Sequence, residues 1–96
     1  MVSRPRDVSS RFETGRIVVT RNALDQLPPH DVFRAIGRHI RGDWGELGEE
    51  DRKEKEAALR KGLRLLSVYT ATNAKSFWII TEADRSLTTV LLPEDY

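Results

Sequence analysis

The chain has 96 residues, of which 39% are hydrophobic and 32% are charged, and its formal net charge is +1. This length holds one small domain, and the composition excludes collagen-like, low-complexity and strongly disordered proteins. The absence of cysteine excludes disulfide bonds, thiol catalysis and thiolate metal sites, and it predicts a reducing, cytoplasmic setting.

No apolar run approaches the roughly 20 residues that span a bilayer, and the N-terminal residues lack the apolar segment of a secretion signal, so we expect no membrane contact. The charge is unevenly distributed. Residues 1–41 carry eight Lys and Arg against four Asp and Glu, whereas residues 42–58 carry three against seven. This division predicts a field that orients the protein on a partner, or else an acidic helix that is simply solvated.

Residues 1–15 show no periodicity and are expected to form a flexible arm, ahead of a single domain at 16–96. Phe12 is the one large apolar side chain of this arm, and it is a candidate for docking on the domain. The β-branched run at 16–20 predicts a strand. Thr20 is suited to cap a short helix at 21–27, which the Pro28-Pro29 pair ends.

Residues 29–41 have the clearest helical periodicity, with Val32, Phe33, Ile36 and Ile40 on one face, which we expect to be buried. Residues 49–61 form a second long helical pattern, with acidic residues in the first turn, basic residues in the last and a glycine after it. Because this helix has few apolar residues, we expect it to lie mostly in water.

Three strands are predicted at 63–72, 76–81 and 87–92, and the breaks between them are short and polar. The order β-α-α-α-β-β-β predicts an α+β fold with one four-stranded, mainly antiparallel sheet and helices packed on one face.

Alternation along these strands predicts two apolar faces. One would carry Leu65, Tyr69, Phe77, Ile79 and Leu91, and the other Leu66, Val68, Trp78, Ile80 and Val90. The first two helices cover one face only, and an uncovered apolar face is usually an interface. We therefore expect a protein partner or a homodimer on the second face, unless Phe12 and the third helix cover it.

Arg34, Arg38 and Arg41 share a stripe of the 29–41 helix, with His30 one turn earlier. Guanidinium groups bind phosphates and carboxylates through a planar fork of donors, so this stripe is a candidate binding site. The alternative is a solvated basic face. Nucleic acid is a possible partner here, but a net charge of +1 does not favour it.

His39 precedes Asp43 and Glu46, and these three side chains are candidates for acid–base chemistry or metal binding. Because no second histidine stands at ligand spacing, we predict no metal site, and no motif indicates a cofactor. Trp44 lies between two glycines, where it is either an anchor for the loop or a stacking platform.

The turn that contains Glu82, Asp84 and Arg85 is either an ion-pair network or a site that offers Arg85 to an anion. The sequence leaves open whether this turn meets the loop at 42–46. If it does, His39 and Arg85 would share a pocket with the acidic side chains of both loops, which would favour catalysis.

Several segments resemble a family of small bacterial proteins of plasmids and integrative elements, sometimes labelled plasmid-related protein or type I restriction subunit. They are Arg38-His39 with Gly42-Asp43-Trp44-Gly45-Glu46, then Gly62-Leu63-Arg64-Leu65-Leu66-Ser67-Val68-Tyr69, and Trp78-Ile79-Ile80-Thr81-Glu82-Ala83-Asp84-Arg85-Ser86 with Leu91-Leu92-Pro93-Glu94-Asp95-Tyr96. The resemblance covers about five-sixths of the chain, from Gly15 onward. It implies a cytoplasmic accessory protein of a mobile element, and we expect it to act by protein–protein contact, against a host defence or restriction system.

The order of elements also resembles that of RelE- and ParE-type toxins, which cleave RNA or poison gyrase. In the ribonucleases of that group, basic and phenolic side chains flank the scissile phosphate. The resemblance offers His39, Arg64, Arg85 and Tyr96 for such roles. The chain departs from the group in its low net charge and in its middle hairpin strand, which reads Phe77-Trp78-Ile79-Ile80 where arginine is frequent.

Overall fold

The computed structural model describes residues 10–96, so residues 1–9 of the predicted arm lie outside the described part. Four strands, three α-helices and one short 3-10 helix follow one another in the predicted order. They are β1 (Arg16–Val19), α1 (Arg21–Gln26), α2 (Pro29–Ile40), α3 (Glu49–Lys61), β2 (Leu65–Thr70), β3 (Ser76–Thr81), β4 (Leu87–Leu91) and η1 (Pro93–Asp95). The predicted α+β class is confirmed.

One sheet holds all four strands, in the spatial order β1-β4-β3-β2. The strands β2, β3 and β4 form two antiparallel pairs, as the short connections between them predict. β1 lies parallel to β4, with Ile17 beside Thr88 and Val19 beside Val90. A parallel pair cannot be joined by a tight turn, and here all three helices and the β2–β3 hairpin separate the two strands in sequence.

The predicted helix ends are present. Thr20 Oγ1 accepts a hydrogen bond from the Ala23 N–H at 3.1 Å at the start of α1. Gly62 ends α3 with a φ of +71°, in the left-handed region that glycine adopts at low cost. None of the helices in residues 10–96 combines the length and the apolar composition that a membrane crossing requires.

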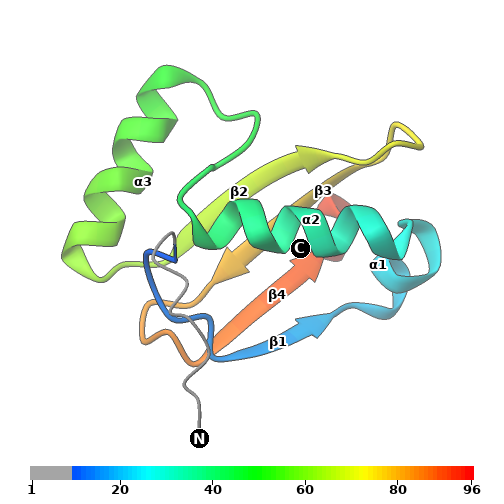
Figure 1. Ribbon diagram of the computed structural model, residues 1–96, viewed down its shortest axis with the longest axis horizontal. Coiled ribbons are helices and arrows are strands. Elements are labelled where there is room, and N and C mark those ends of the chain that lie inside the picture. Colours follow the sequence, from blue (N-terminus) through cyan, green and yellow to red (C-terminus); the bar gives the residue numbers. More distant parts are fainter. Residues whose placement is uncertain (1–9) are drawn as a thin grey trace, which may run out of the picture.

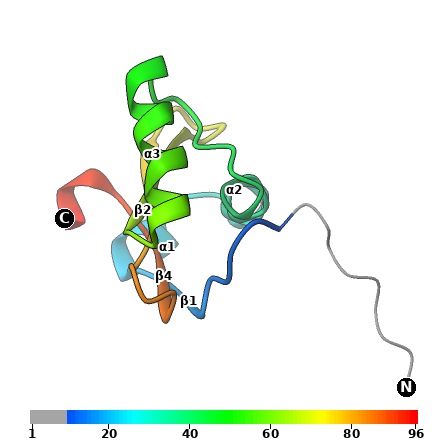
Figure 2. The same ribbon diagram turned by 90° about the vertical axis from the view of Figure 1, so that its left-hand side faces the viewer.

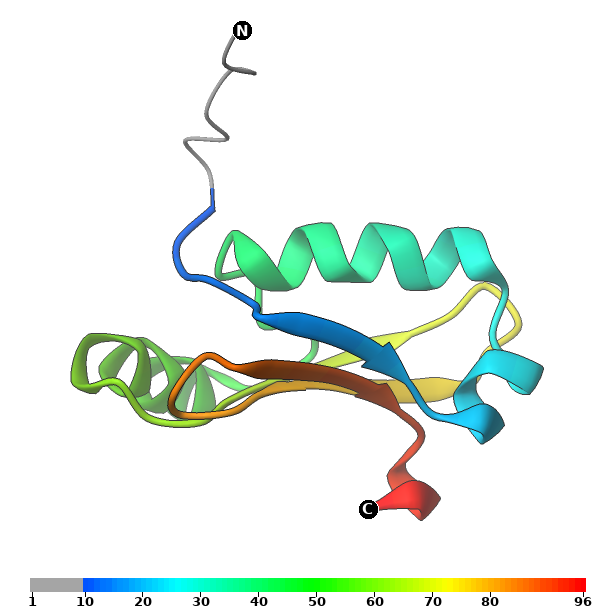
Figure 3. The same ribbon diagram turned by 90° about the horizontal axis from the view of Figure 1, so that it is seen from below.

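The elements form two layers, and α2 lies across one face of the sheet (Figure 1). Figure 2 shows α2 and the C-terminal turn η1 on opposite sides of the sheet. α3 lies at one end of the sheet, where Ala58 packs with Leu65 of β2 (Figure 3). We call the side under α2 the helix face and the other side the open face, because no described helix lies across the middle of it.

The side of α2 that meets the sheet matches the predicted one only in part. Ala35 is 4% exposed and His39 is fully buried, whereas Phe33 is 79% exposed. Val32 and Ile36 pack against the core from one side of the helix. The prediction that Phe33 lies in the core is therefore wrong. The helix turns inward a small residue and a polar one because the sheet below offers hydrogen-bond partners to that polar side chain.

The register of the strands assigns each sheet residue to a face. The helix face carries Leu65, Ser67, Tyr69, Phe77, Ile79, Thr81, Thr88 and Val90. The open face carries Leu66, Val68, Thr70, Ser76, Trp78, Ile80, Thr89 and Leu91. The predicted sides of Val90 and Leu91 are thus interchanged, because Val90 pairs with Ile79 and Leu91 pairs with Trp78.

Residues 10–15 of the predicted arm contact the domain. Arg11 donates its backbone N–H to the Ile40 carbonyl at 2.8 Å, and its guanidinium pairs with Glu56 at 2.9 Å. Phe12 adds an apolar contact to this polar attachment. The packed body therefore includes residues that precede β1.

Phe12 belongs to a small second core between α2 and α3. The buried members of this core are Trp44, Ala58 and Leu65, and Phe12, Leu47 and Leu59 pack against them. The ring of Phe12 meets the ring of His39 edge-on, with 5.2 Å between the centroids. The alternative in which Phe12 covers the open face is therefore wrong.

Candidate functional site

His39 is fully buried at the centre of the domain. Its Nδ1 lies 2.6 Å from Ser67 Oγ, and its Nε2 lies 2.9 Å from Thr81 Oγ1. Thr81 Oγ1 lies 2.7 Å from Thr88 Oγ1, which donates to the Thr14 carbonyl at 2.7 Å. This chain of hydrogen bonds, which we call the polar core, connects α2 to three strands and to the segment before β1.

The last acceptor determines every proton position in the polar core. A carbonyl cannot donate, so the Thr88 hydroxyl gives its single proton to Thr14. Thr81 must then donate to Thr88, and the Nε2–H of His39 must donate to Thr81. In the neutral ring Nδ1 then carries no proton and accepts from the Ser67 hydroxyl.

The buried position also determines the charge of His39. Burial, and after it the positive charge of Arg85, lower the pKa of His39 to about 4, so the ring is neutral at ordinary pH. A general base must reach the proton of a substrate, and both nitrogens of this ring are already engaged away from solvent. His39, named as a catalytic candidate, thus holds the interior together.

Arg85 and Asp84 fasten the turn between β3 and β4. Arg85, with a φ of +61°, donates from its NH1 to the Leu63 carbonyl at 2.8 Å and to the Glu82 carbonyl at 2.9 Å. The Asp84 carboxylate accepts from the N–H and from the hydroxyl of Ser86, at 3.0 and 2.6 Å. These contacts direct NH1 of Arg85 to backbone carbonyls, so this part of the guanidinium holds the turn in place.

The acidic side chains of the two polar loops do not converge on His39. Asp43 pairs with Arg38 at 2.8 Å, and Glu46 accepts from the Thr70 hydroxyl at 2.9 Å. The shared pocket that would favour catalysis at His39 is therefore not formed. Within residues 10–96, no group of three His, Asp or Glu side chains is placed to hold a metal ion.

Trp44 is 2% exposed, and its Nε1 donates to the Glu56 carboxylate at 3.0 Å. Its ring meets the ring of His39 edge-on, with centroids 5.8 Å apart. Gly45, with a φ of +79°, follows it, and a Cβ there would lie 1.9 Å from the Val68 carbonyl oxygen. Glycine therefore lets this loop approach β2, and the buried ring serves as an anchor.

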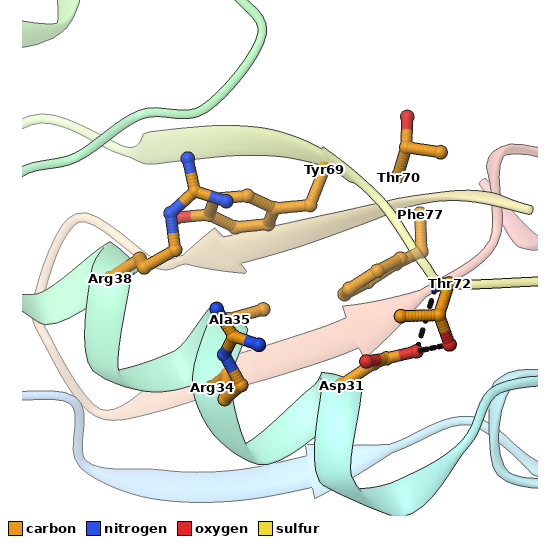
Figure 4. Close-up of a pocket in the computed structure, with 8 residues that line it drawn as sticks. All are labelled: Asp31, Arg34, Ala35, Arg38, Tyr69, Thr70, Thr72 and Phe77. Carbon is orange, nitrogen blue, oxygen red and sulfur yellow. Dashed lines mark hydrogen bonds between the residues drawn. The ribbon is translucent and has the colours of Figure 1, made fainter. Parts of the chain in front are cut away.

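A groove of about 200 Å³ lies between α2 and the end of β2 (Figure 4). It is lined by Asp31, Arg34, Ala35, Arg38, Tyr69, Thr70, Thr72 and Phe77. Figure 4 shows the Arg38 guanidinium over the ring of Tyr69, with 4.7 Å from its carbon to the ring centroid. Asp31 accepts from the backbone N–H of Thr72 at 2.9 Å and from its hydroxyl at 2.7 Å.

The predicted arginine stripe divides in the structure. Arg34 and Arg41 are exposed, whereas Arg38 is half-buried and binds Asp43 through two hydrogen bonds of 2.8 and 3.2 Å. That contact holds the pKa of Asp43 below its usual range, so both groups stay charged and form an ion pair. Asp31 also lies beside Arg34, so the two carboxylates offset part of the positive charge of the stripe.

A second groove, of about 300 Å³, lies on the open face. It is lined by Lys55, Arg64, Leu65, Leu66, Trp78, Ile80 and Tyr96, and we call it the aromatic groove. The rings of Trp78 and Tyr96 meet at 65°, with their centroids 5.4 Å apart. Two strands supply its apolar floor, and residues outside the sheet supply its rim.

Arg64 is central to that rim. Its NH1 donates to the Tyr96 hydroxyl at 2.8 Å, and its carbon lies 5.4 Å from the centroid of the same ring. Its Nε lies 3.5 Å from Glu82 Oε1, so part of the positive charge is balanced. Lys55 of α3 adds a second cation. The arrangement suits a ligand with an apolar or aromatic group for the floor and an anionic group for the rim.

The structure thus brings together Arg64 and Tyr96, two of the residues that sequence named, and separates both from His39. Lys55 and Trp78 were not named as site residues. A lysine in a charged helix gives no signal of its neighbours, because only the path from α3 into β2 places it at the groove. Ser67 did give a signal, since alternation puts this polar side chain in phase with buried apolar ones.

Comparisons of the chain with protein-family models, with curated proteins and with solved structures found no match. The assignment of a site therefore rests on the contacts of this chain.

Proposed function

We propose that the protein is a small cytoplasmic accessory factor of a bacterial mobile element that binds another protein through the aromatic groove. The observation that carries the binding role is the pairing of Trp78 and Tyr96 with the cations Lys55 and Arg64, on a sheet face that no described helix crosses. The sequence resemblance to proteins of plasmids and integrative elements supports the setting. A host defence or restriction protein is the partner that this setting suggests.

The groove fits a partner segment that presents a large apolar side chain next to a carboxylate. Apolar area removed from water contributes about 25 cal/mol per Å², so the floor around Trp78 supplies most of the binding energy. Arg64 has the fork of donors that matches a carboxylate. Because Glu82 offsets part of this charge, the rim selects an acidic neighbour more than it adds affinity.

The test uses a random peptide library displayed on phage and selected on the immobilised protein. We expect enriched peptides to combine an aromatic or long aliphatic residue with Asp or Glu. Synthetic copies of these peptides should lose most of their affinity for Trp78→Ala and for Arg64→Glu, measured by titration calorimetry.

Arg34→Glu is the matched control, because it makes the same charge change at an exposed arginine of α2. It should leave peptide affinity unchanged. Enriched peptides that bind Trp78→Ala as well as the parent protein would place the site elsewhere, and the absence of any enrichment would count against a peptide-binding groove.

A second candidate function, a ribonuclease of the RelE type, is favoured by one contact in the same groove. Arg64 donates to the Tyr96 hydroxyl at 2.8 Å, with Lys55 nearby. Two cations beside a phosphate and a phenolic group for proton transfer are components of RNA cleavage, and Trp78 offers a ring on which a base can stack. His39 and Arg85 have no part in this version of the hypothesis.

Induced expression in a bacterial culture separates the two functions. A ribonuclease should arrest growth, and Tyr96→Phe should relieve the arrest because it removes only the hydroxyl. A binding protein should leave growth and bulk RNA intact in both strains. Sequencing of RNA ends after induction identifies cleavage directly.

A further inference from the structure

The two edge strands of the sheet, β2 and β1, differ in whether another segment bonds to their outer sides. At the β2 edge, Val68 donates its N–H to the Trp44 carbonyl at 3.1 Å and accepts the N–H of Glu46 at 2.8 Å. At the other edge, β1 pairs with β4 alone, and no described segment pairs with its outer side (Figure 3). From Ile17 to Val19 this strand carries no proline or charged residue. Edges without such protection pair readily with another strand.

The pairing with β4 sets the backbone directions in β1. The N–H of Arg16 donates to the carbonyl of Ser86, just before β4, at 3.1 Å, and the N–H of Thr20 donates to the carbonyl of Val90 at 3.0 Å. Alternate residues of a strand direct their polar groups to opposite sides, so the N–H and C=O of Ile17 and Val19 point away from β4. The open edge therefore presents donors and acceptors at two positions.

Apolar side chains border this edge on the helix-face side. Ile17 is 43% exposed and Phe33 of α2 is 79% exposed. Ile17 lies on the helix face because it pairs with the buried Thr88. Arg34 and Arg38 line the groove on the β2 side of α2, and helical spacing places Phe33 on the other flank, toward β1.

We propose that a second copy of this chain covers the edge, with the two β1 strands antiparallel about a two-fold axis at Val18. In this register Ile17 of each copy lies opposite Val19 of the other, and each such pair exchanges both of its N–H···O=C hydrogen bonds. The edge of β1 is complementary to a second copy of itself, because it supplies both the outward donors and the outward acceptors, and it carries apolar side chains on the helix face.

The backbone directions also allow a two-fold axis at Ile17 or at Val19. Repulsion between the two Arg16 side chains disfavours the first of these, and the end of β1 disfavours the second. An axis at Ile17 would bring the two Arg16 side chains to roughly 8 Å, whereas an axis at Val18 separates them by roughly 14 Å, at about 3.4 Å per residue. Like charges at the larger distance are largely screened at physiological salt. An axis at Val19 would set Ile17 opposite Arg21, where β1 has ended and α1 has begun.

Sedimentation equilibrium across a wide range of protein concentration tests the proposal. The parent protein should reach twice the chain mass, and Ile17→Lys should shift it to the monomer by placing a charge in the pair. Leu63→Lys is the matched control, because Leu63 is 50% exposed and lies beside β2. This control should remain dimeric, and circular dichroism should show both variants folded.

Val18→Cys tests the register, since the chain has no other cysteine. Residues that face each other across the axis should form an intermolecular disulfide on mild oxidation, whereas Ile17→Cys should not. A monomer at every concentration, or a dimer that Ile17→Lys leaves intact, would overturn the proposal. A disulfide through Ile17→Cys alone would move the axis and refute this register. Peptide binding at the aromatic groove should survive Ile17→Lys, so this proposal and the proposed function fail separately.

Discussion

The helix face of the sheet buries its polar side chains completely, whereas the open face leaves its polar ones, Thr70, Ser76 and Thr89, exposed or half-buried. Ser67, Thr81 and Thr88 are fully buried beneath α2, together with His39. Across the sheet, Trp78 is half-buried beside the aromatic groove. The two faces therefore differ in how deeply their polar side chains are buried.

This difference shows that hydrogen bonding, as well as apolar area, decides which face a helix covers. A buried polar group without a partner costs about 1 to 3 kcal/mol, so a helix that covers Ser67 and Thr81 must complete their hydrogen bonds, although Thr81 also has Thr88 as a partner. His39 does so with its two ring nitrogens. The polar side chains of the open face reach solvent, so they place no such restriction on what packs there.

The largest expected effect is on the helix face. His39→Leu leaves the Ser67 hydroxyl without its partner and removes the donor to Thr81, which keeps only its bond to Thr88, and we expect the free energy of unfolding to fall by about 4 kcal/mol. Urea denaturation followed by circular dichroism measures this loss. A loss below about 1 kcal/mol would mean that the polar core adds little to stability, and the contrast between the faces would disappear.

A pH series sharpens the same contrast, with an effect of about 3 kcal/mol. The pKa of His39 is about 4 in the folded protein and near 6.5 when unfolded, so the unfolded chain takes up the proton first as the pH falls. The contribution of neutral His39 to the free energy of unfolding is complete above about pH 6.5 and is lost between pH 6.5 and 4, by about 1.4 kcal/mol per pH unit. Urea midpoints between pH 7.5 and 5 report about 2 kcal/mol of this loss, and His39→Asn, which cannot titrate, should flatten the profile.

Truncation on the open face should cost less. Trp78 is only half-buried, so we expect Trp78→Ala to lower the free energy of unfolding by about 2 kcal/mol. The same variant should lose peptide binding while it remains folded. If its cost equals that of His39→Leu, the open face is part of the core that holds the domain together.

The smallest effect is expected at the arginine stripe. Arg34→Ala should change the free energy of unfolding by less than about 0.5 kcal/mol, because the side chain is exposed. Nucleic-acid binding through Arg34, Arg38 and Arg41 would fall steeply with added salt. Fluorescence anisotropy with a labelled RNA should show weak binding that Arg34→Ala does not change.

Local sequence signals located most elements of this fold. Thr20, the Pro28-Pro29 pair and Gly62 mark helix ends, and the two short polar breaks specify the antiparallel hairpins. Local signals did not reveal which strand β1 joins, because that pairing depends on the return of the chain across the whole sheet. Phe33 of α2 was also misassigned to the core, since periodicity ranks Phe33 above Ala35 by hydrophobicity and takes no account of His39.

The sequence by itself determined the elements, their order, the α+β class and the presence of two usable sheet faces, because helix caps, strand alternation and turn residues act over a few positions. Only the tertiary structure decided which groups meet. It enclosed His39 among hydroxyls, used Arg85 to hold a turn, and brought Lys55, Arg64 and Tyr96 around Trp78. Each of these outcomes depends on contacts between segments that are distant in sequence. Local sequence patterns do not specify the backbone path that creates these contacts.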